Sequence, residues 1–189
     1  MQKLIVFNSV SLDGYFTDEN SDMSFAHNPH PDAEWDAFVE SNANNGGTLL
    51  FGRITYELML QFWPTPLAAQ QMPEVAERMN NLPKVVFSRT LENASWKNTT
   101  LIKDDLIHET RKLKEKSANG MAILGSGSIV AQLAGHGLID EYQVVVVPVV
   151  LGKGRTMFDG LAEKVNLSLI GTRAFKNGNV LLTYQPAAS

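Results

Sequence analysis

The 189-residue sequence contains no cysteine, no long apolar run and no block of like charge. Without cysteine the chain forms no disulfide and offers neither a thiol nucleophile nor a cysteine-ligated zinc site. No apolar run reaches the roughly 18 residues that span a membrane, and the N-terminus MQKLIVFNSVSLDG turns polar too soon for a signal peptide. We therefore expect a soluble, cytoplasmic protein without a membrane partner.

Basic residues are in deficit, with 16 lysines and arginines against 20 acidic residues and a net charge of −4. The most basic stretch, residues 111–116, is interleaved with glutamate and apolar residues, which predicts a solvated helix face. Nucleic acid is therefore not an expected partner. The histidines are too scattered along the chain to predict a metal site (His27, His30, His108 and His136).

The sequence does contain material for one sizeable core, with 44% hydrophobic residues. In the first two-thirds of the chain, short apolar runs alternate with stretches at helical spacing. The predicted strands there are 3–7, 48–51, 84–88, 101–102 and 121–124. Asp32 is placed to cap a helix that carries Trp35 and Phe38, and the proline-punctuated segment 64–83 is expected to hold one short helix.

After Gly137 the pattern changes, because the runs 139–150, 165–175 and 179–185 follow one another without a helix between them. Asn177-Gly178 predicts a hairpin between the last two runs. The sequence therefore predicts one α/β domain over residues 1–189, arranged as three layers. Its central sheet is expected to be twisted and mostly parallel, with antiparallel C-terminal edge strands and helices on both faces.

Three predicted strands end in residues suited to bind an anion. In the first, Gly52 permits close backbone approach, and Arg53 and Thr55 place a charge and a hydroxyl at the start of a helix. In the second, Ser88-Arg89 follows a buried strand, and such an arginine can bind a phosphate monoester such as the 2′-phosphate of NADP. Taken alone, each stretch is better explained as an ordinary surface turn.

The third strand end is Gly125-Ser126-Gly127-Ser128, where backbone N–H groups are left to face an anion. It is not the Rossmann fingerprint, because Val130 stands where glycine or alanine is required. Ligands of open parallel sheets bind at the carboxyl ends of the strands. The joint occurrence of three such ends therefore predicts a ligand that carries phosphate groups.

These motifs, in this order, resemble the dihydrofolate reductase fold. The stretches SLDGY (11–15) and PVVLGKG (148–154) look more like the C-terminal reductase domain of bacterial riboflavin-biosynthesis proteins, and the likeness spans essentially the whole chain. The resemblance implies an NADPH-dependent reductase of a small heterocycle. The substrate would be a pyrimidine, as in reduction of 5-amino-6-(5-phosphoribosylamino)uracil, or a pteridine such as dihydrofolate. An NADPH-binding sensor without turnover is the alternative.

The resemblance also implies which residues bind the cofactor. The first two strand ends would meet its phosphates, with Ser88 and Arg89 on the adenosine 2′-phosphate, and the third would hold the pyrophosphate. The nicotinamide would lie near the end of the first strand. The implied cofactor-binding residues are Ser9, Val10, Gly52, Arg53, Thr55, Ser88, Arg89, Gly125, Ser126, Gly127 and Ser128.

For catalysis, the resemblance points to a carboxylate that helps to protonate the substrate. Asp13, Asp36 or a bound water would deliver the proton, although Asp36 is equally compatible with an ordinary solvated helix residue. The zinc deaminase domain of the bifunctional riboflavin enzymes is excluded, because the chain has no cysteine and no room for it. The family further implies a homodimer, to which the late strands and Leu151-Gly152 would contribute.

Overall fold

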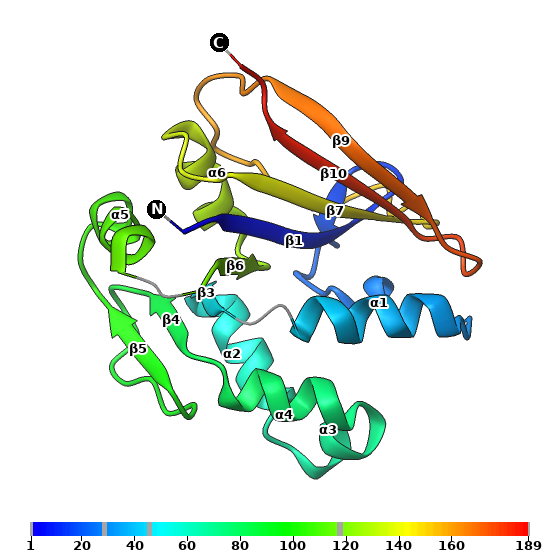
Figure 1. The fold of residues 1–189 in the computed structure, drawn as a ribbon, viewed down its shortest axis with the longest axis horizontal. Coiled ribbons are helices and arrows are strands. Elements are labelled where there is room, and N and C mark those ends of the chain that lie inside the picture. The colour runs from blue at the N-terminus through cyan, green and yellow to red at the C-terminus, as the bar shows by residue number, and fades with distance from the viewer. Residues whose placement is uncertain (1, 28–29, 45–46, 117–118, 189) are drawn as a thin grey trace.

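The computed structural model of the protein describes residues 2–27, 30–44, 47–116 and 119–188, apart from the side chains of residues 43 and 44. Within these residues an eight-stranded sheet runs in the order β5-β4-β3-β6-β1-β7-β10-β9 (Figure 1). Its strands are β1 (Leu4–Ser11), β3 (Thr48–Gly52), β4 (Lys84–Phe87), β5 (Thr99–Ile102), β6 (Met121–Leu124), β7 (Glu141–Val147), β9 (Leu167–Ala174) and β10 (Val180–Pro186).

Neighbouring strands from β5 to β7 are parallel, whereas β10 is antiparallel to both β7 and β9. The predicted mostly parallel sheet with antiparallel C-terminal edge strands is thereby confirmed. One strand of the tail differs, because β7 pairs in parallel with β1. The helix between β6 and β7 explains this pairing, since a helical crossover returns the chain in the same direction.

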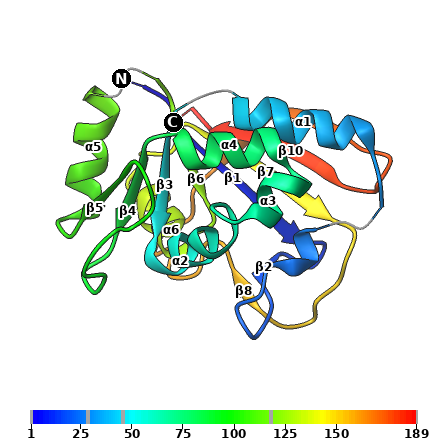
Figure 2. The same ribbon diagram turned by 90° about the horizontal axis from the view of Figure 1, so that it is seen from below.

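Helices cover both faces of the sheet, as predicted (Figures 1 and 2). They are α1 (Ala33–Asn44), α2 (Arg53–Phe62), α3 (Pro66–Gln71), α4 (Pro73–Asn81), α5 (Leu106–Lys116) and α6 (Gly127–Gly135), with a short 3₁₀ helix at Ser24–Ala26. Apolar side chains of α5 and α6 share one core cluster with β1, β3 and β6. Those of α2 and α4 pack on the opposite face, where α1 covers β7 and β10.

Alternation along β1 shows how the sequence divides these two faces. Leu4, Val6 and Val10 belong to the core cluster of α5 and α6, whereas Phe7 packs against Phe38 of α1. This is the period of two that a strand imposes on its side chains. Asn8 is the polar member of the first row, and it is buried.

The segment 64–83 contains two helices, where one was predicted. Pro66 and Pro73 each stand at the first position of a helix, where the missing proline N–H leaves no hydrogen bond unmade. Met72 lies between them in a non-helical conformation and separates α3 from α4. At α1, by contrast, the prediction is confirmed, because Asp32 Oδ1 accepts the N–H of Glu34 at 3.0 Å.

The basic stretch 111–116 is only partly solvated, which corrects the predicted solvated helix face. Lys114 is buried, its Nζ donates to the carbonyl oxygen of Leu138 at 2.8 Å, and it forms an ion pair with Asp140. This lysine lies on the side of α5 that faces the core, so helical spacing alone did not reveal its burial. Among the described helices, none has the length and apolar character needed to span a bilayer.

A second, two-stranded sheet lies beyond the end of β1 (Figure 2). In it β2 (Tyr15–Thr17) is antiparallel to β8 (Arg155–Thr156). Strands this short leave no alternating pattern in the sequence, and the pairing was not predicted. The small sheet joins the turn after β1 to the long connection that follows β7.

Candidate functional site

A groove of about 590 Å³ opens at the carboxyl ends of the parallel strands. It is bordered by the start of α2, the end of β4, the start of α6 and the β2–β8 sheet. The three strand-end motifs, far apart in the sequence, meet here. The predicted cofactor-binding residues along its walls are Gly52, Arg53, Thr55, Ser88, Arg89, Ser126, Gly127 and Ser128.

Hydrogen bonds tie the first motif directly to the third. Ser126 Oγ accepts the N–H of Gly52 at 2.6 Å, and the N–H of Ser126 donates to Thr55 Oγ1 at 3.0 Å. Ser126 adopts a left-handed conformation, with φ of 59°. The hydroxyl groups of Thr55 and Ser126 therefore hold the two loops together at the groove.

Gly125 is buried behind the groove and is required by the close approach of Thr55. Its φ is +66°, and a Cβ atom at this position would lie 2.6 Å from Thr55 Cγ2. Any larger residue would combine backbone strain with a steric clash. Gly125 thus shapes the turn, and the residues that follow it, Ser126 to Ser128, line the groove.

Asn8 fixes the same turn from the end of β1. Its Oδ1 accepts the N–H of Gly125 at 2.6 Å, and its Nδ2 lies 3.3 Å from the carbonyl oxygen of Gly125 and 3.1 Å from Met157 Sδ. Sequence reasoning missed this residue. The available signal was its polarity in the otherwise apolar inward row of β1.

The helix starts at the groove retain unused backbone donors. Neither α2 nor α6 has a side-chain cap at its N-terminus. Among the described residues, no acceptor meets the N–H groups of Gly127 and Ser128. Uncapped N–H groups and the helix dipole both favour an anion at this position.

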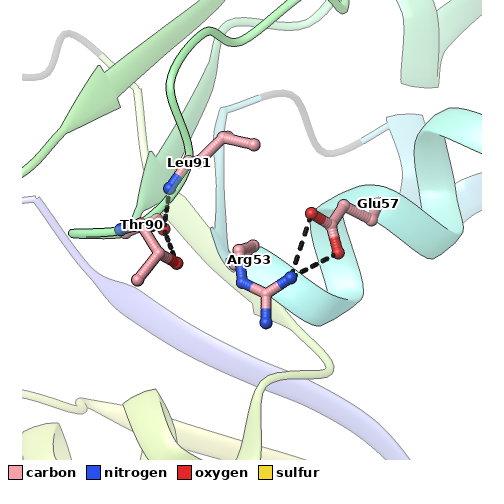
Figure 3. Close-up of polar contacts among 5 residues, drawn as sticks. Arg53, Glu57, Thr90 and Leu91 are labelled. Atoms are coloured by element: carbon pink, nitrogen blue, oxygen red, sulfur yellow. Dashed lines mark hydrogen bonds and ion pairs between the residues drawn. The ribbon is translucent and has the colours of Figure 1, made fainter.

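The second motif forms a compact turn with an arginine at its surface. Ser88 Oγ accepts the N–H of Leu91 at 2.9 Å and that of Thr90 at 3.2 Å (Figure 3). Arg89 is exposed, and its guanidinium makes no hydrogen bond or ion pair with the described residues. Arg53, across the groove, donates to the Glu57 carboxylate at 3.0 and 3.2 Å (Figure 3).

The groove is lined by more cations than the sequence predicted. Lys103 and Arg155 join Arg53 and Arg89 in its wall. Three carboxylates also border it, those of Asp104, Asp105 and Asp159, of which Asp105 Oδ1 accepts the N–H of His108. Arg155 follows directly after the stretch PVVLGKG, and this position next to a recognised motif could have indicated that it lies at the groove.

Asp13 lies in the turn after β1 and is tied to the backbone of residues 151–152. Its Oδ1 accepts from Ser11 Oγ at 2.6 Å and from the N–H of Leu151 at 3.1 Å, while Oδ2 accepts the N–H of Gly152 at 2.7 Å. The Ser11 hydroxyl, followed by these two N–H groups, lowers the pKa of Asp13 to about 2. The carboxylate is therefore ionised at neutral pH.

The remaining predicted site residues lie outside the lining of the groove. Ser9 and Val10 are near the end of β1, partly and fully buried respectively. Asp36 is an exposed residue of α1, beside Trp35, whose ring packs edge-on against Phe175. Their roles toward nicotinamide and substrate remain predictions. No group of His, Asp or Glu in the described part of the chain is arranged to hold a metal ion.

Comparison with known proteins agrees with this fold. The chain is 28% identical over 183 residues to the uncharacterized protein YyaP of Bacillus subtilis (strain 168), covering 97% of this chain and 94% of that protein. A solved structure from Shewanella sp. PV-4, provisionally assigned to riboflavin biosynthesis, matches 99% of this chain and 100% of its own length, with 24% identity and a TM-score of 0.78.

A third match is dihydrofolate reductase from Enterococcus faecalis, solved in complex with NADP(H) and RAB-propyl. It covers 98% of this chain and 97% of its own, with 17% identity and a TM-score of 0.62. This likeness confirms the predicted dihydrofolate reductase-like fold. The family model of the RibD C-terminal domain matches residues 2–181, and the chain therefore belongs to the RibD C-terminal domain family.

Proposed function

We propose that this protein is an NADPH-dependent reductase that transfers hydride to a small heterocycle, either a pyrimidine of the riboflavin pathway or a pteridine. The groove carries this proposal, because it gathers three segments with anion-binding chemistry at one edge of the sheet. Open parallel sheets bind their ligands at this edge. The dihydrofolate reductase-like fold of the family further supports a reductase.

The residues of the groove fit a dinucleotide with a 2′-phosphate. The uncapped N–H groups of Gly127 and Ser128 would receive the pyrophosphate, and Arg89 beside the Ser88 turn would receive the 2′-phosphate. NADPH, when bound, would supply the hydride, so the protein itself needs to position both reactants and exclude water. Ser9 and Val10 would border the nicotinamide.

A proton must also reach the reduced substrate. Asp13 is a poorer proton donor than an ordinary carboxyl group, because its pKa is lowered to about 2 and its carboxylate already accepts a hydroxyl and two N–H groups. Asp36 on α1 is exposed and thus accessible to solvent. We propose Asp36, or a water molecule, as the proton source.

Titration with NADPH and NADH, followed by nicotinamide fluorescence, tests the cofactor. We expect Arg89→Ala to weaken NADPH about tenfold or more, the loss typical of a charge-assisted hydrogen bond, and to leave NADH nearly unchanged. Arg78→Ala is the matched control, since Arg78 is an exposed arginine of α4 outside the groove. Equal losses for both cofactors would contradict the 2′-phosphate role of Arg89.

Oxidation of NADPH in the presence of pteridine and pyrimidine substrates then tests turnover. Substrate-dependent oxidation that falls in Asp36→Asn would support both the reductase and its proton donor. Tight NADPH binding without oxidation by any substrate would favour a sensor that keeps the cofactor site. Failure to bind NADPH at all would overturn the proposal.

We also propose that the protein is a homodimer, as is implied for its family. The edge strand β9 exposes Leu169 and Ile170, which are 54% and 50% accessible, and Val150 is 66% accessible. Apolar side chains at a free sheet edge favour association with a second copy. Light scattering should report a dimer, and Ile170→Glu should shift it toward the monomer, whereas Thr172→Glu on the same strand should not.

A further inference from the structure

The segment 149–157, here called the strap, follows β7 and forms one wall of the groove. It is bound to the turn after β1 along its length. The N–H of Leu12 donates to the carbonyl oxygen of Val149 at 2.8 Å, and in the small sheet Thr17 pairs with Arg155 and Tyr15 with Thr156. The strap thereby carries Arg155 and Thr156 to the groove.

The strap has little freedom to lie elsewhere. A Cβ atom on Gly154 would lie 2.0 Å from the carbonyl oxygen of Thr17, so the two backbones are in direct contact. At its far end, a Cβ atom on Gly127 would lie 3.2 Å from the carbonyl oxygen of Met157. The strap therefore packs against the first residue of α6, next to the unused N–H groups.

Asp13 is the side chain that joins the strap to the turn after β1. Its carboxylate accepts the N–H groups of both Leu151 and Gly152, and its position is fixed in turn by the Ser11 hydroxyl. The hydroxyl of Ser11 also accepts the N–H of Tyr15, which opens β2. The Asp13 carboxylate thus adds a side-chain link to the backbone contacts that hold the strap against the turn after β1.

We propose that Arg155 binds the pyrophosphate of the dinucleotide at the start of α6, and that Asp13 is the positioning residue that holds the strap carrying Arg155. This inference rests on the proposed function, since it assigns residues within the same groove. Arg155 lines the groove, and its guanidinium has no hydrogen-bond or ion-pair partner among the described residues.

The donors on the two sides of this position complement each other. The N–H groups of Gly127 and Ser128 approach from the helix, and the guanidinium of Arg155 would approach from the strap. A phosphate offers several acceptor oxygens, and a guanidinium binds two of them in parallel. Arg89 stands at the separate wall formed by the end of β4, so the two arginines are assigned to different phosphates.

Two ligands separate these assignments, because NADPH carries the pyrophosphate whereas adenosine 2′-monophosphate does not. Dissociation constants for both are measured by calorimetry on the full chain and on Arg155→Gln. We expect this variant to bind NADPH about tenfold more weakly, as for loss of one charge-assisted contact, and adenosine 2′-monophosphate unchanged. Arg155→Lys should recover only part of the loss, because a lysine cannot make the paired contact.

Lys153→Gln is the matched control within the strap. Lys153 is an exposed cation 3.9 Å from Glu19, and it does not line the groove. Its replacement should leave both dissociation constants unchanged. Equal NADPH affinities of wild type and Arg155→Gln, or equal losses in Arg155→Gln and Lys153→Gln, would overturn the assignment of Arg155.

The positioning role of Asp13 is tested through Arg155. Asp13→Asn should weaken NADPH in the wild-type background and have almost no effect in the Arg155→Gln background, because its influence passes through that side chain. Adenosine 2′-monophosphate should again bind normally, which also shows that the variant is folded. If Asp13→Asn does not fold, Asp13→Glu, which keeps the charge but displaces the strap, takes its place in the cycle. Equal losses in both backgrounds would refute the positioning role.

Failure of the inference and failure of the proposed function give different results. If wild type binds neither ligand, the proposed function is wrong and this inference falls with it. If wild type binds both and Arg155→Gln binds both equally well, the groove remains a dinucleotide site and only the inference is wrong.

Discussion

The two ends of the parallel strands differ in how their positively charged side chains are paired. Strand β4 shows both cases, with Lys84 at its start and Arg89 just past its end. At its start, Lys84 is buried, with its Nζ 2.8 Å from the carbonyl oxygens of Met79 and Leu82 and 3.1 Å from that of Asn80. The ammonium also lies 4.6 Å from the ring centre of Trp96. Every proton of this cation is used within the protein, at the C-terminus of α4.

The other buried lysine at the amino ends of the strands, Lys114, also has its partners within the protein. Lys114 pairs with Asp140, and Asp140 Oδ2 also accepts the N–H of Leu4 at 2.7 Å, at the start of β1. Past the carboxyl ends, by contrast, Arg89 and Arg155 are exposed and have no partner among the described residues. The two buried lysines at the amino ends are paired within the protein, whereas the guanidinium groups of Arg89 and Arg155 have no partner among the described residues and could bind an anion.

The largest expected effect comes from disturbing the turn behind the groove with Gly125→Ala. The new Cβ would clash with Thr55, displace the start of α6 and lower NADPH affinity at least about a hundredfold, because a binding site tolerates errors of only about 0.5 Å. Gly137→Ala is the matched control, since Gly137 has nearly the same φ, +63°, and open space around it. Both variants should lose roughly 1–2 kcal/mol from the left-handed backbone. Equal NADPH affinities would contradict the role of the turn.

At the amino ends, Asp140→Ala should destabilise the fold without affecting the ligand. The variant leaves the buried Lys114 ammonium without its carboxylate partner. Because Asp140 is partly exposed, the loss in the free energy of unfolding should be about 3 kcal/mol or somewhat less. Urea unfolding measures this loss, and NADPH affinity of the folded protein should be unchanged. Glu109→Ala, which breaks the surface pair with Lys112, should cost about 0.5 kcal/mol or less. A large loss of NADPH affinity in Asp140→Ala would contradict the conclusion that the charged residues at the amino ends act on stability alone.

Stability should also depend on pH through Lys84. Burial, with a smaller contribution from the charge of Lys97, lowers the pKa of Lys84 from its usual 10.5 to about 8. Between these two values the unfolded chain binds more protons than the native state, so the free energy of unfolding should rise with pH. The gain between pH 8 and 9.5 should be about 1–2 kcal/mol.

The matched variant is Lys84→Met, and the quantity compared with wild type is the slope of the free energy of unfolding against pH. This variant loses the titrating group, so the contribution between pH 8 and 9.5 should disappear whatever its stability at pH 7. Urea unfolding at several pH values measures both slopes. Parallel slopes in the two proteins would show that Lys84 does not carry the effect.

The smallest expected effect concerns Arg53, whose partner is on its own helix. Glu57→Gln should free the guanidinium for the ligand, because an exposed pair at this spacing contributes only about 0.3–0.5 kcal/mol. NADPH affinity should therefore rise about twofold, and the gain should shrink at high salt. Glu77→Gln, at an exposed position of α4 outside the groove, should change nothing. A loss of affinity in Glu57→Gln would mean that Arg53 needs its partner to be held in place.

Local patterns in the sequence were sufficient for most of the fold. The apolar runs located the strands, and Asn177-Gly178 located the hairpin between β9 and β10. The parallel pairing of β7 with β1 was not predicted, because an isolated strand pattern does not reveal its neighbour. The burial of Lys114 was missed for a related reason, since its partner Asp140 is 26 residues away.

For the groove, the sequence indicated the three anion-binding stretches but not how they are joined. The contact of Ser126 with Gly52 spans 74 residues and that of Asn8 with Gly125 spans 117, so neither leaves a local pattern. The wall formed by the strap was missed because β8 is only two residues long. The sequence therefore predicted the chemistry of each segment but not the interactions between segments that are distant along the chain.

The cluster of Asn8, Thr55, Gly125 and Ser126 also constrains how this protein can change over evolutionary time. Each of these residues holds another, so a substitution at one position alters which residues are tolerated at the next. A Cβ atom on Gly125 would lie 2.6 Å from Thr55 Cγ2 and 2.8 Å from Thr55 Oγ1, so Thr55→Ala, which removes both atoms, would have to come before Gly125→Ala rather than after it. The order in which substitutions arise, and not only their identity, therefore decides which variants of this turn are accessible to selection.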